Sequence, residues 1–169
     1  LSAIIYLSLF FVLIVCVLFL HASVVYTCIF ALGTRLYTQT LFKNMRPALL
    51  FAFSTSSSNA TMPITLNVAR TRVGAHNSIA SFTIPLGATV NMDGTAIMQG
   101  IATVFIAQAY GLDLTMGEYL AVVATATLAS IGTAGVPGVG LITLAMVLQQ
   151  VGLPVEGIGL IIGVDRLLD

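Results

Sequence analysis

The sequence predicts an all-α membrane protein in which transmembrane helices are combined with two re-entrant helical hairpins. Hydrophobic residues make up 58% of its 169 residues and charged residues only 7%, and its mean hydropathy is +1.06. Soluble domains do not have such a composition. Two charge-free stretches also have polar or glycine-rich centres. A lipid-facing helix does not tolerate such centres, so broken elements buried in protein are expected there.

The first element is predicted to be a long, tilted transmembrane helix over residues 1–34. This stretch contains no Asp, Glu, Lys or Arg, and a span needs about 20 apolar residues. His21 is its main polar interruption. It could relay a proton, but it has no acidic neighbour in the sequence, which favours a histidine that merely packs against another helix. Five basic residues over positions 35–72 then mark a membrane–water boundary on either side of the next element.

Residues 47–69 are predicted to form re-entrant hairpin 1. The stretch is free of charge, and its centre reads STSSSNATMP over residues 54–63. So many hydroxyls do not suit lipid, and Pro63 removes a hydrogen bond from a continuous helix. Basic residues stand at both ends, so both ends are expected on the cytoplasmic side. The alternative is one ordinary transmembrane span.

Residues 82–110 are predicted to form a broken transmembrane helix with the segment GATVNMDGT, residues 87–95, at its middle. Asp93 is then near the bilayer midplane, where a charge costs roughly 2.5–3.5 kcal/mol and usually marks a functional site. Asn91 and Gly94 favour departures from helix that would free carbonyls to bind a cation. The alternative is an aspartate that is satisfied by neighbouring hydroxyl groups, with no ligand.

Residues 119–155 are predicted to form re-entrant hairpin 2. These 37 residues carry no charge, and one straight helix would be ~55 Å long, nearly twice the ~30 Å hydrocarbon core. The centre, SIGTAGVPGVG over 130–140, contains helix-breaking glycines and a proline. Acidic residues flank this stretch, so it is expected to enter from the outer side. Residues 156–169 are expected to begin the last transmembrane helix.

The two hairpins resemble each other weakly. Ser56–Pro63 and Ser130–Pro137 each have serine first, alanine fifth and proline last, and an aspartate follows each about thirty residues later. Two similar halves of opposite orientation are typical of inverted-repeat transporters, whose broken elements meet at the midplane. We also expect the chain to be a piece of a longer protein, because it begins with Leu1 and stops at Asp169 within an apolar pattern.

These motifs resemble the dicarboxylate/amino acid:cation symporter family, which includes the glutamate/aspartate transporters. The similar parts are the serine-rich centre, NMDGT at 91–95, SIGTAGVPG at 130–138 and the pair Asp165 and Asp169. The resemblance covers residues 1–169 and implies a sodium-coupled symporter for an acidic amino acid, working by an elevator mechanism. It implies that the chain is part of the transport domain of a homotrimer, held by a scaffold outside this chain, in the cell membrane.

The resemblance also implies site residues. Sodium would be held by oxygens of Gly87, Thr89, Asn91, Asp93, Ser130, Ile131 and Thr133. The substrate would contact Ser56, Ser57, Ser58, Thr95, Val136, Pro137, Gly138, Val139, Gly140 and Asp169, whose carboxylate would bind the amino group. Oxygen ligands of this kind suit hard cations. Some family members carry arginine where this chain has Ser56, so the choice of substrate stays open.

Alternative functions remain at this stage. A related carrier could take neutral amino acids or C4-dicarboxylates, with sodium or proton coupling. An intramembrane aspartyl protease would also place two aspartates in the membrane, but Met92-Asp93 and Gly163-Val164-Asp165 do not match its Tyr-Asp and Gly-x-Gly-Asp motifs. We therefore expect no enzyme. Six basic residues and zero net charge do not make a nucleic-acid-binding face.

Overall fold

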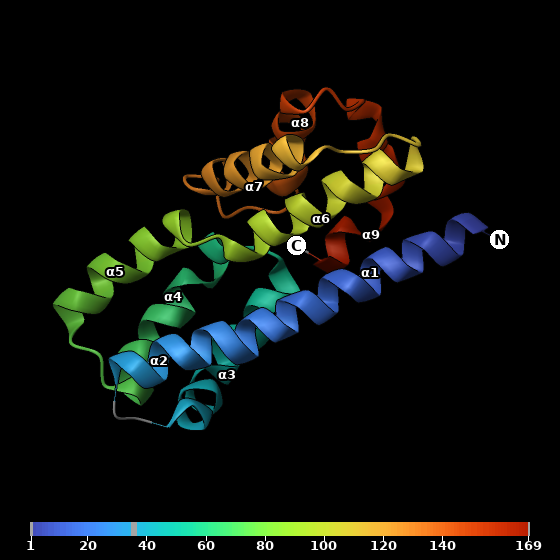
Figure 1. The fold of residues 1–169 in the computed structure, drawn as a ribbon. Helices are drawn as coiled ribbons and strands as arrows, with labels where there is room; N and C mark the ends of the chain where they lie inside the picture. Colours follow the sequence, from blue (N-terminus) through green and yellow to red (C-terminus); the bar gives the residue numbers. More distant parts are fainter. Residues whose placement is uncertain (1, 35–36, 169) are drawn as a thin grey trace.

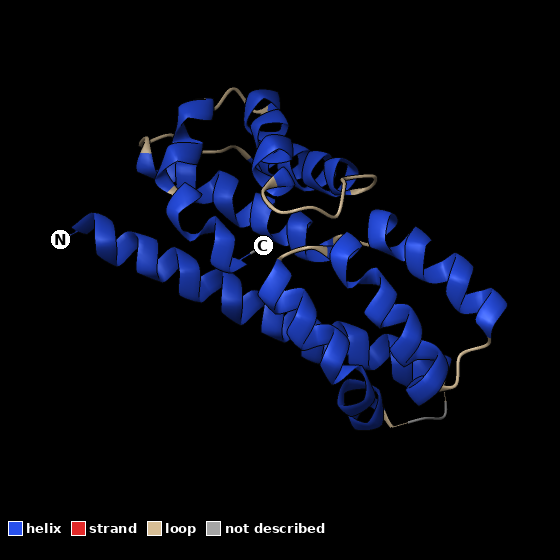
Figure 2. Ribbon diagram, turned by 180° about the vertical axis from the view of Figure 1, so that it is seen from behind, coloured by secondary structure: helices blue, strands red, loops and turns tan. Residues whose placement is uncertain are grey.

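The computed structural model describes residues 2–34 and 37–168, and every regular element in these ranges is a helix (Figures 1 and 2). The all-α prediction is confirmed. In chain order the helices are α1 (Ser2–Leu20), the π-helix η1 (His21–Tyr26), α2 (Thr27–Gly33), α3 (Thr38–Thr55), α4 (Ser58–Val68), the π-helix η2 (Ala69–Val73), α5 (Asn77–Val90), α6 (Asp93–Ala109), α7 (Met116–Ser130), α8 (Val139–Gln150), the 3-10 helix η3 (Val155–Leu160) and α9 (Ile162–Leu168). Asp169 lies outside the described residues.

The first three helical elements form one continuous rod along one side of the molecule (Figure 1). Within the described residues, Ile4–Gly33 is the one helix whose length and composition would let it cross a membrane. Many of its apolar side chains are exposed, among them Ile4, Phe19 and Leu32. Such a surface is what a membrane helix presents to lipid or to neighbouring helices.

Two pairs of packed helices correspond in position to the predicted hairpins. α3 and α4 pack together and are joined at Ser56 and Ser57, while α7 and α8 pack together and are joined by residues 131–138. Their re-entrant placement in a bilayer stays a prediction. The break in the first pair is not at Pro63, which lies inside α4. The chain turns earlier, where Ser56 adopts a left-handed conformation with φ +48°, so Pro63 removes only one hydrogen bond from α4.

A second interruption separates α5 from α6. Asn91 and Met92 have non-helical backbone angles (φ −104°, ψ 74° and φ −109°, ψ 54°), and α6 restarts at Asp93. Gly87 still accepts the Asn91 N–H at 3.0 Å, so α5 keeps its hydrogen bonding up to the break. The result is a carboxylate at the first residue of a new helix, where the helix dipole favours negative charge.

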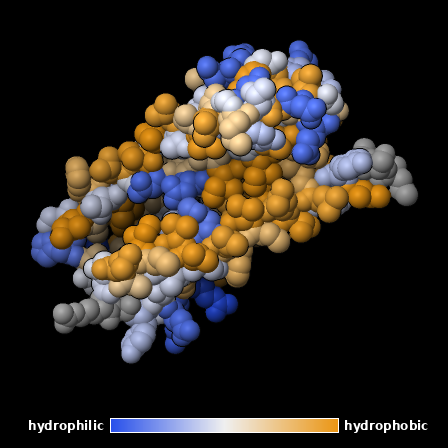
Figure 3. Space-filling view, in the orientation of Figure 1, coloured by the Kyte–Doolittle hydropathy of each residue, from blue (hydrophilic) through white to orange (hydrophobic). Residues whose placement is uncertain are grey.

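The packed core lies around α6, which contacts α1, α7 and α8. Its largest fully buried apolar side chains are Ile14, Ile106, Leu144, Leu148 and Ile161, and burying each contributes about 1.5–3 kcal/mol. The α3–α5 part buries mainly small residues, such as Ala48 and Ala80. The packing around α6 therefore holds this helix firmly. Its N-terminal end lies where the core around α6 meets the α3–α5 part. Figure 3 shows hydrophilic residues in the middle of this face with hydrophobic residues around them.

Candidate functional site

A cavity of about 310 Å³ lies where the α3–α4 turn, the α5–α6 break and the α7–α8 tip come together. Of the residues predicted to contact substrate, Ser56, Ser57, Ser58, Thr95, Val136 and Gly140 line it. Of those predicted to hold sodium, Asn91, Asp93 and Thr133 line it. Three segments that are far apart in the sequence are thus brought to one compartment.

The two tips touch each other at Gly135. Its carbonyl accepts the Ser57 hydroxyl at 2.7 Å and the Asn59 N–H at 3.0 Å. A Cβ atom added to Gly135 would lie 2.8 Å from the Ser58 Cβ atom, closer than carbon atoms approach without displacement. Only glycine permits this contact.

The α7–α8 tip is also fastened to the α5–α6 break, since the Gly132 N–H donates to the Thr89 carbonyl at 2.8 Å. Gly132 has φ +81°, a left-handed conformation that glycine adopts without a steric penalty. Three hydrogen bonds between described residues thus join Gly132 and Gly135 of the tip to other segments, two at Gly135 and one at Gly132.

The cavity has an unusual balance of charge. Among the described residues that line it, Asp93 is the one charged side chain. Three helices begin there, α4 at Ser58, α6 at Asp93 and α8 directly before Gly140. Helix N-termini carry partial positive charge and favour anionic groups. The compartment therefore suits a carboxylate near the tips, provided that the charge of Asp93 is balanced.

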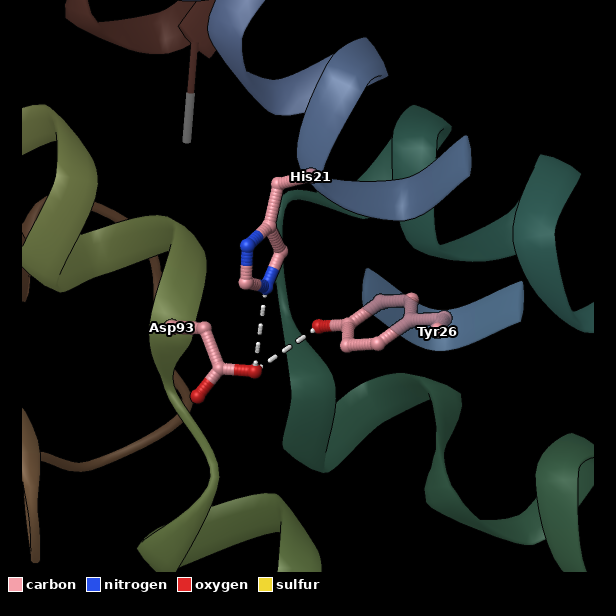
Figure 4. Close-up of polar contacts among 3 residues, drawn as sticks. All are labelled: His21, Tyr26 and Asp93. Carbon is pink, nitrogen blue, oxygen red and sulfur yellow. Dashed lines mark hydrogen bonds and ion pairs between the residues drawn. The ribbon is translucent and has the colours of Figure 1, made fainter. Parts of the chain in front are cut away.

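The long first helix supplies the partners of Asp93 (Figure 4). The Tyr26 hydroxyl donates to Asp93 Oδ2 at 3.0 Å, and His21 Nε2 lies 3.4 Å from the same oxygen. The sequence around His21 contains no acidic residue, but the fold brings Asp93 to it from 72 residues away, so His21 does more than pack against another helix. Tyr26 was not among the predicted site residues, and no spacing in the sequence points to it.

The predicted sodium ligands are only partly free to bind a cation. The carbonyls of Gly87, Thr89 and Ser130 each accept an N–H group, from Asn91, Gly132 and Thr133 respectively. A carbonyl has two lone pairs, so each keeps one. Within residues 2–34 and 37–168, the Asn91 carbonyl has no recorded donor. Asn91 and Asp93 therefore offer the most accessible oxygens at the break.

Several predicted residues lie beside the cavity rather than on its wall. The lining residues do not include Gly87, Thr89, Ser130 and Ile131, nor Pro137, Gly138 and Val139 of the α7–α8 tip. Asp165 is buried in α9. In the described part of the chain, no three His, Cys, Asp or Glu side chains converge as a metal site would require. Among the described residues that line the cavity, a cation would meet hydroxyl and backbone oxygens around one carboxylate, that of Asp93.

Comparison with known proteins identifies the family of this chain. The family model described as the sodium:dicarboxylate symporter family matches residues 1–169. The chain belongs to this family. An excitatory amino acid transporter of Caenorhabditis elegans is 41% identical over 163 residues, which is 96% of this chain and 32% of that protein. Excitatory amino acid transporter 1 of Rattus norvegicus is 42% identical over 163 residues, which is 96% of this chain and 30% of that protein. Excitatory amino acid transporter 4 of Mus musculus is 46% identical over 152 residues, which is 90% of this chain and 27% of that protein.

Membership confirms the resemblance seen in the sequence and makes the chain part of an integral membrane protein. The family and these relatives are transporters and not enzymes, so the prediction of no enzyme is confirmed and the protease alternative is wrong. The chain spans about a third of the length of the curated relatives that it matches.

Proposed function

We propose that this chain is part of a secondary active transporter that carries an acidic amino acid across the cell membrane together with sodium ions. The observation that supports this most is the convergence of two hairpin tips and a helix break on one cavity. Its volume of about 310 Å³ is at the lower end of the range for small-molecule sites. The cavity is the substrate compartment, and the serine hydroxyls and helix N-termini receive the α-carboxylate.

Electrostatics supplies the reason for sodium coupling. A dicarboxylic amino acid carries a net charge of −1, and Asp93 already places a negative charge in the cavity wall. Two like charges at about 4 Å repel by about 4 kcal/mol at an effective dielectric constant of 20. A sodium ion on the oxygens of Asp93 and Asn91 removes this repulsion, so the acidic substrate binds well only when sodium is bound. Gly87, Thr89, Ser130, Ile131 and Thr133 would complete the cation sites.

The α7–α8 tip acts as the gate of the compartment. Opening it breaks the three hydrogen bonds at Gly132 and Gly135, each of which contributes about 1 kcal/mol net. A total of about 3 kcal/mol leaves the open form populated at about 1%, so a ligand can bias the equilibrium strongly. The closed unit then moves across the membrane as an elevator, within a homotrimer that is held by a scaffold outside this chain.

The residues of the cavity wall also support a second candidate function, transport of a different substrate. Among the described lining residues none is basic, so the described part of the chain provides no cation for the side-chain carboxylate of the substrate. This favours a carrier of the same family for a neutral amino acid, while membership of the sodium:dicarboxylate symporter family favours a dicarboxylate, such as a C4-dicarboxylate. For either substrate, sodium or proton coupling stays open.

Uptake by the full-length protein in proteoliposomes separates these candidates. Radiolabelled aspartate, serine and succinate are compared with an inward sodium gradient, with choline in place of sodium, and with an imposed proton gradient. The proposal requires sodium-dependent aspartate uptake that exceeds serine and succinate uptake. Asp169→Asn should abolish aspartate uptake, because the ammonium group loses its partner. Sodium-independent uptake, or a preference for serine or succinate, contradicts the proposal.

A further inference from the structure

The long first helix contains one local irregularity. α1, η1 and α2 follow one another without a break, but His21–Tyr26 forms a π-helical turn. The sequence of this turn, HASVVY, contains neither glycine nor proline, the usual causes of a distorted helix. Single π-turns within α-helices occur frequently at functional sites.

The π-turn changes where two side chains point. In a regular α-helix, residues five apart point about 140° away from each other. The i to i+5 hydrogen bonding of a π-helix brings such residues to one side. The rings of His21 and Tyr26 are accordingly 5.0 Å apart in an edge-on contact, and both reach Asp93 (Figure 4).

Both contacts use the same carboxylate oxygen. The Tyr26 hydroxyl and His21 Nε2 approach Asp93 Oδ2, at 3.0 and 3.4 Å. In the described ranges no hydrogen-bond partner is recorded for the other oxygen, Oδ1, which points away from both rings (Figure 4). A hydrogen bond to an ionised group is stronger than one between neutral groups, so the bond from Tyr26 holds the orientation of the carboxylate.

We propose that the π-turn of the first helix makes Tyr26, assisted by His21, a positioning residue that holds Asp93 Oδ2 and leaves Oδ1 to bind the cation. The inference rests on the proposed sodium coupling. Tyr26 does not bind the ion itself. It lowers the loss of conformational freedom when sodium binds, because the carboxylate is already oriented.

The test measures sodium binding without any substrate. The thermal unfolding midpoint of the full-length protein in detergent is recorded against sodium chloride, with choline chloride keeping total salt constant. A ligand that binds only the folded state raises this midpoint, and the sodium concentration at half of the rise is compared among variants. Tyr26→Phe should increase it about tenfold, the effect of losing one hydrogen bond to a charged group. His21→Leu should change it in the same direction by less.

The matched control is Tyr119→Phe. Tyr119 and Tyr26 have similar exposed fractions, 40% and 43%, but Tyr119 does not line the cavity at Asp93, so its variant should behave as the parent does. In the Asp93→Asn background, Tyr26→Phe should have no further effect, because its partner no longer carries a charge.

Three results would overturn the inference. If Tyr26→Phe stays within twofold of the parent while Asp93→Asn does not, Tyr26 has no positioning role and the sodium site remains. If Tyr26→Phe lowers the unfolding midpoint equally in sodium and in choline, its role is structural only. If the parent is stabilised no more by sodium than by choline, the proposed coupling fails as well.

Discussion

The contact between the two tips provides the sharpest test of the gate. In Gly135→Ala the added Cβ atom would lie 2.8 Å from the Ser58 Cβ atom and 3.2 Å from the Asn59 nitrogen. The Asn59 Oδ1 atom, also at 3.2 Å, can rotate away, but the Ser58 Cβ atom and the Asn59 backbone nitrogen cannot move without the backbone. The tips must therefore separate, which weakens the two hydrogen bonds to the Gly135 carbonyl, from the Ser57 hydroxyl and the Asn59 N–H.

The expected magnitude follows from these two bonds. At about 1 kcal/mol each, their loss shifts the closed–open equilibrium by about 2 kcal/mol, or about 30-fold. Hydrogen exchange followed by mass spectrometry reads this directly, because the Asn59 amide is protected by Gly135 across the tip contact. Its exchange in Gly135→Ala should be about 30-fold faster than in the parent. Amides within α6, such as that of Ile106, should not change.

The control is Gly100→Ala, because a Cβ atom on Gly100 meets no side chain and no other segment within 4 Å. This variant adds the same methyl group within a helix and should leave exchange at Asn59 unchanged. Exchange at Asn59 within threefold of the parent in Gly135→Ala would refute the argument that this contact holds the gate closed. Faster exchange throughout α6 would show general destabilisation instead.

Three further predictions concern single residues. Asp93→Asn should raise the sodium concentration for half-maximal substrate binding at least tenfold while changing the unfolding midpoint little, and an unchanged sodium titration would exclude Asp93 as a ligand. Ser56→Gly should stabilise the protein by up to about 1 kcal/mol in thermal unfolding, because a left-handed backbone strains any residue with a Cβ atom; a lower midpoint would contradict this. The backbone N–H and then the hydroxyl of Thr115 hold the pKa of Glu118 below its usual value of 4.5, in a capping box at the start of α7. Since the folded-state pKa is lowered, this stabilisation is present above the unfolded-state pKa and is lost as pH falls through the folded-state pKa. Glu118→Gln should therefore lower the unfolding midpoint at pH 7 and lower it less at pH 3. An equal decrease at both pH values would refute the link between the ionisation of Glu118 and stability.

Local sequence patterns were sufficient for the fold class and for the places where helices break. Charge-free stretches that are too long or too polar for a straight helix indicated two turns, and the helices do pair around Ser56–Ser57 and around residues 131–138. Glycine, proline and hydroxyl-bearing residues act on the backbone within a few positions of themselves. Their effects can therefore be predicted without knowing which segments meet. Pro63 is the exception, since a helix accommodates a proline when the turn has been made elsewhere.

The contacts that make a site out of these turns were decided by the tertiary structure alone. Asp93 was recognised from its position in an apolar stretch, but its partner Tyr26 is 67 residues away. Ser57 and Gly135, which join the two tips, are 78 residues apart. Such pairs depend on how α6 packs against α1 and α8, and on a π-turn for which its own six residues carry no helix-breaking signal. Sequence thus determined where the chain must break, whereas packing between distant helices determined which broken ends meet and what they hold.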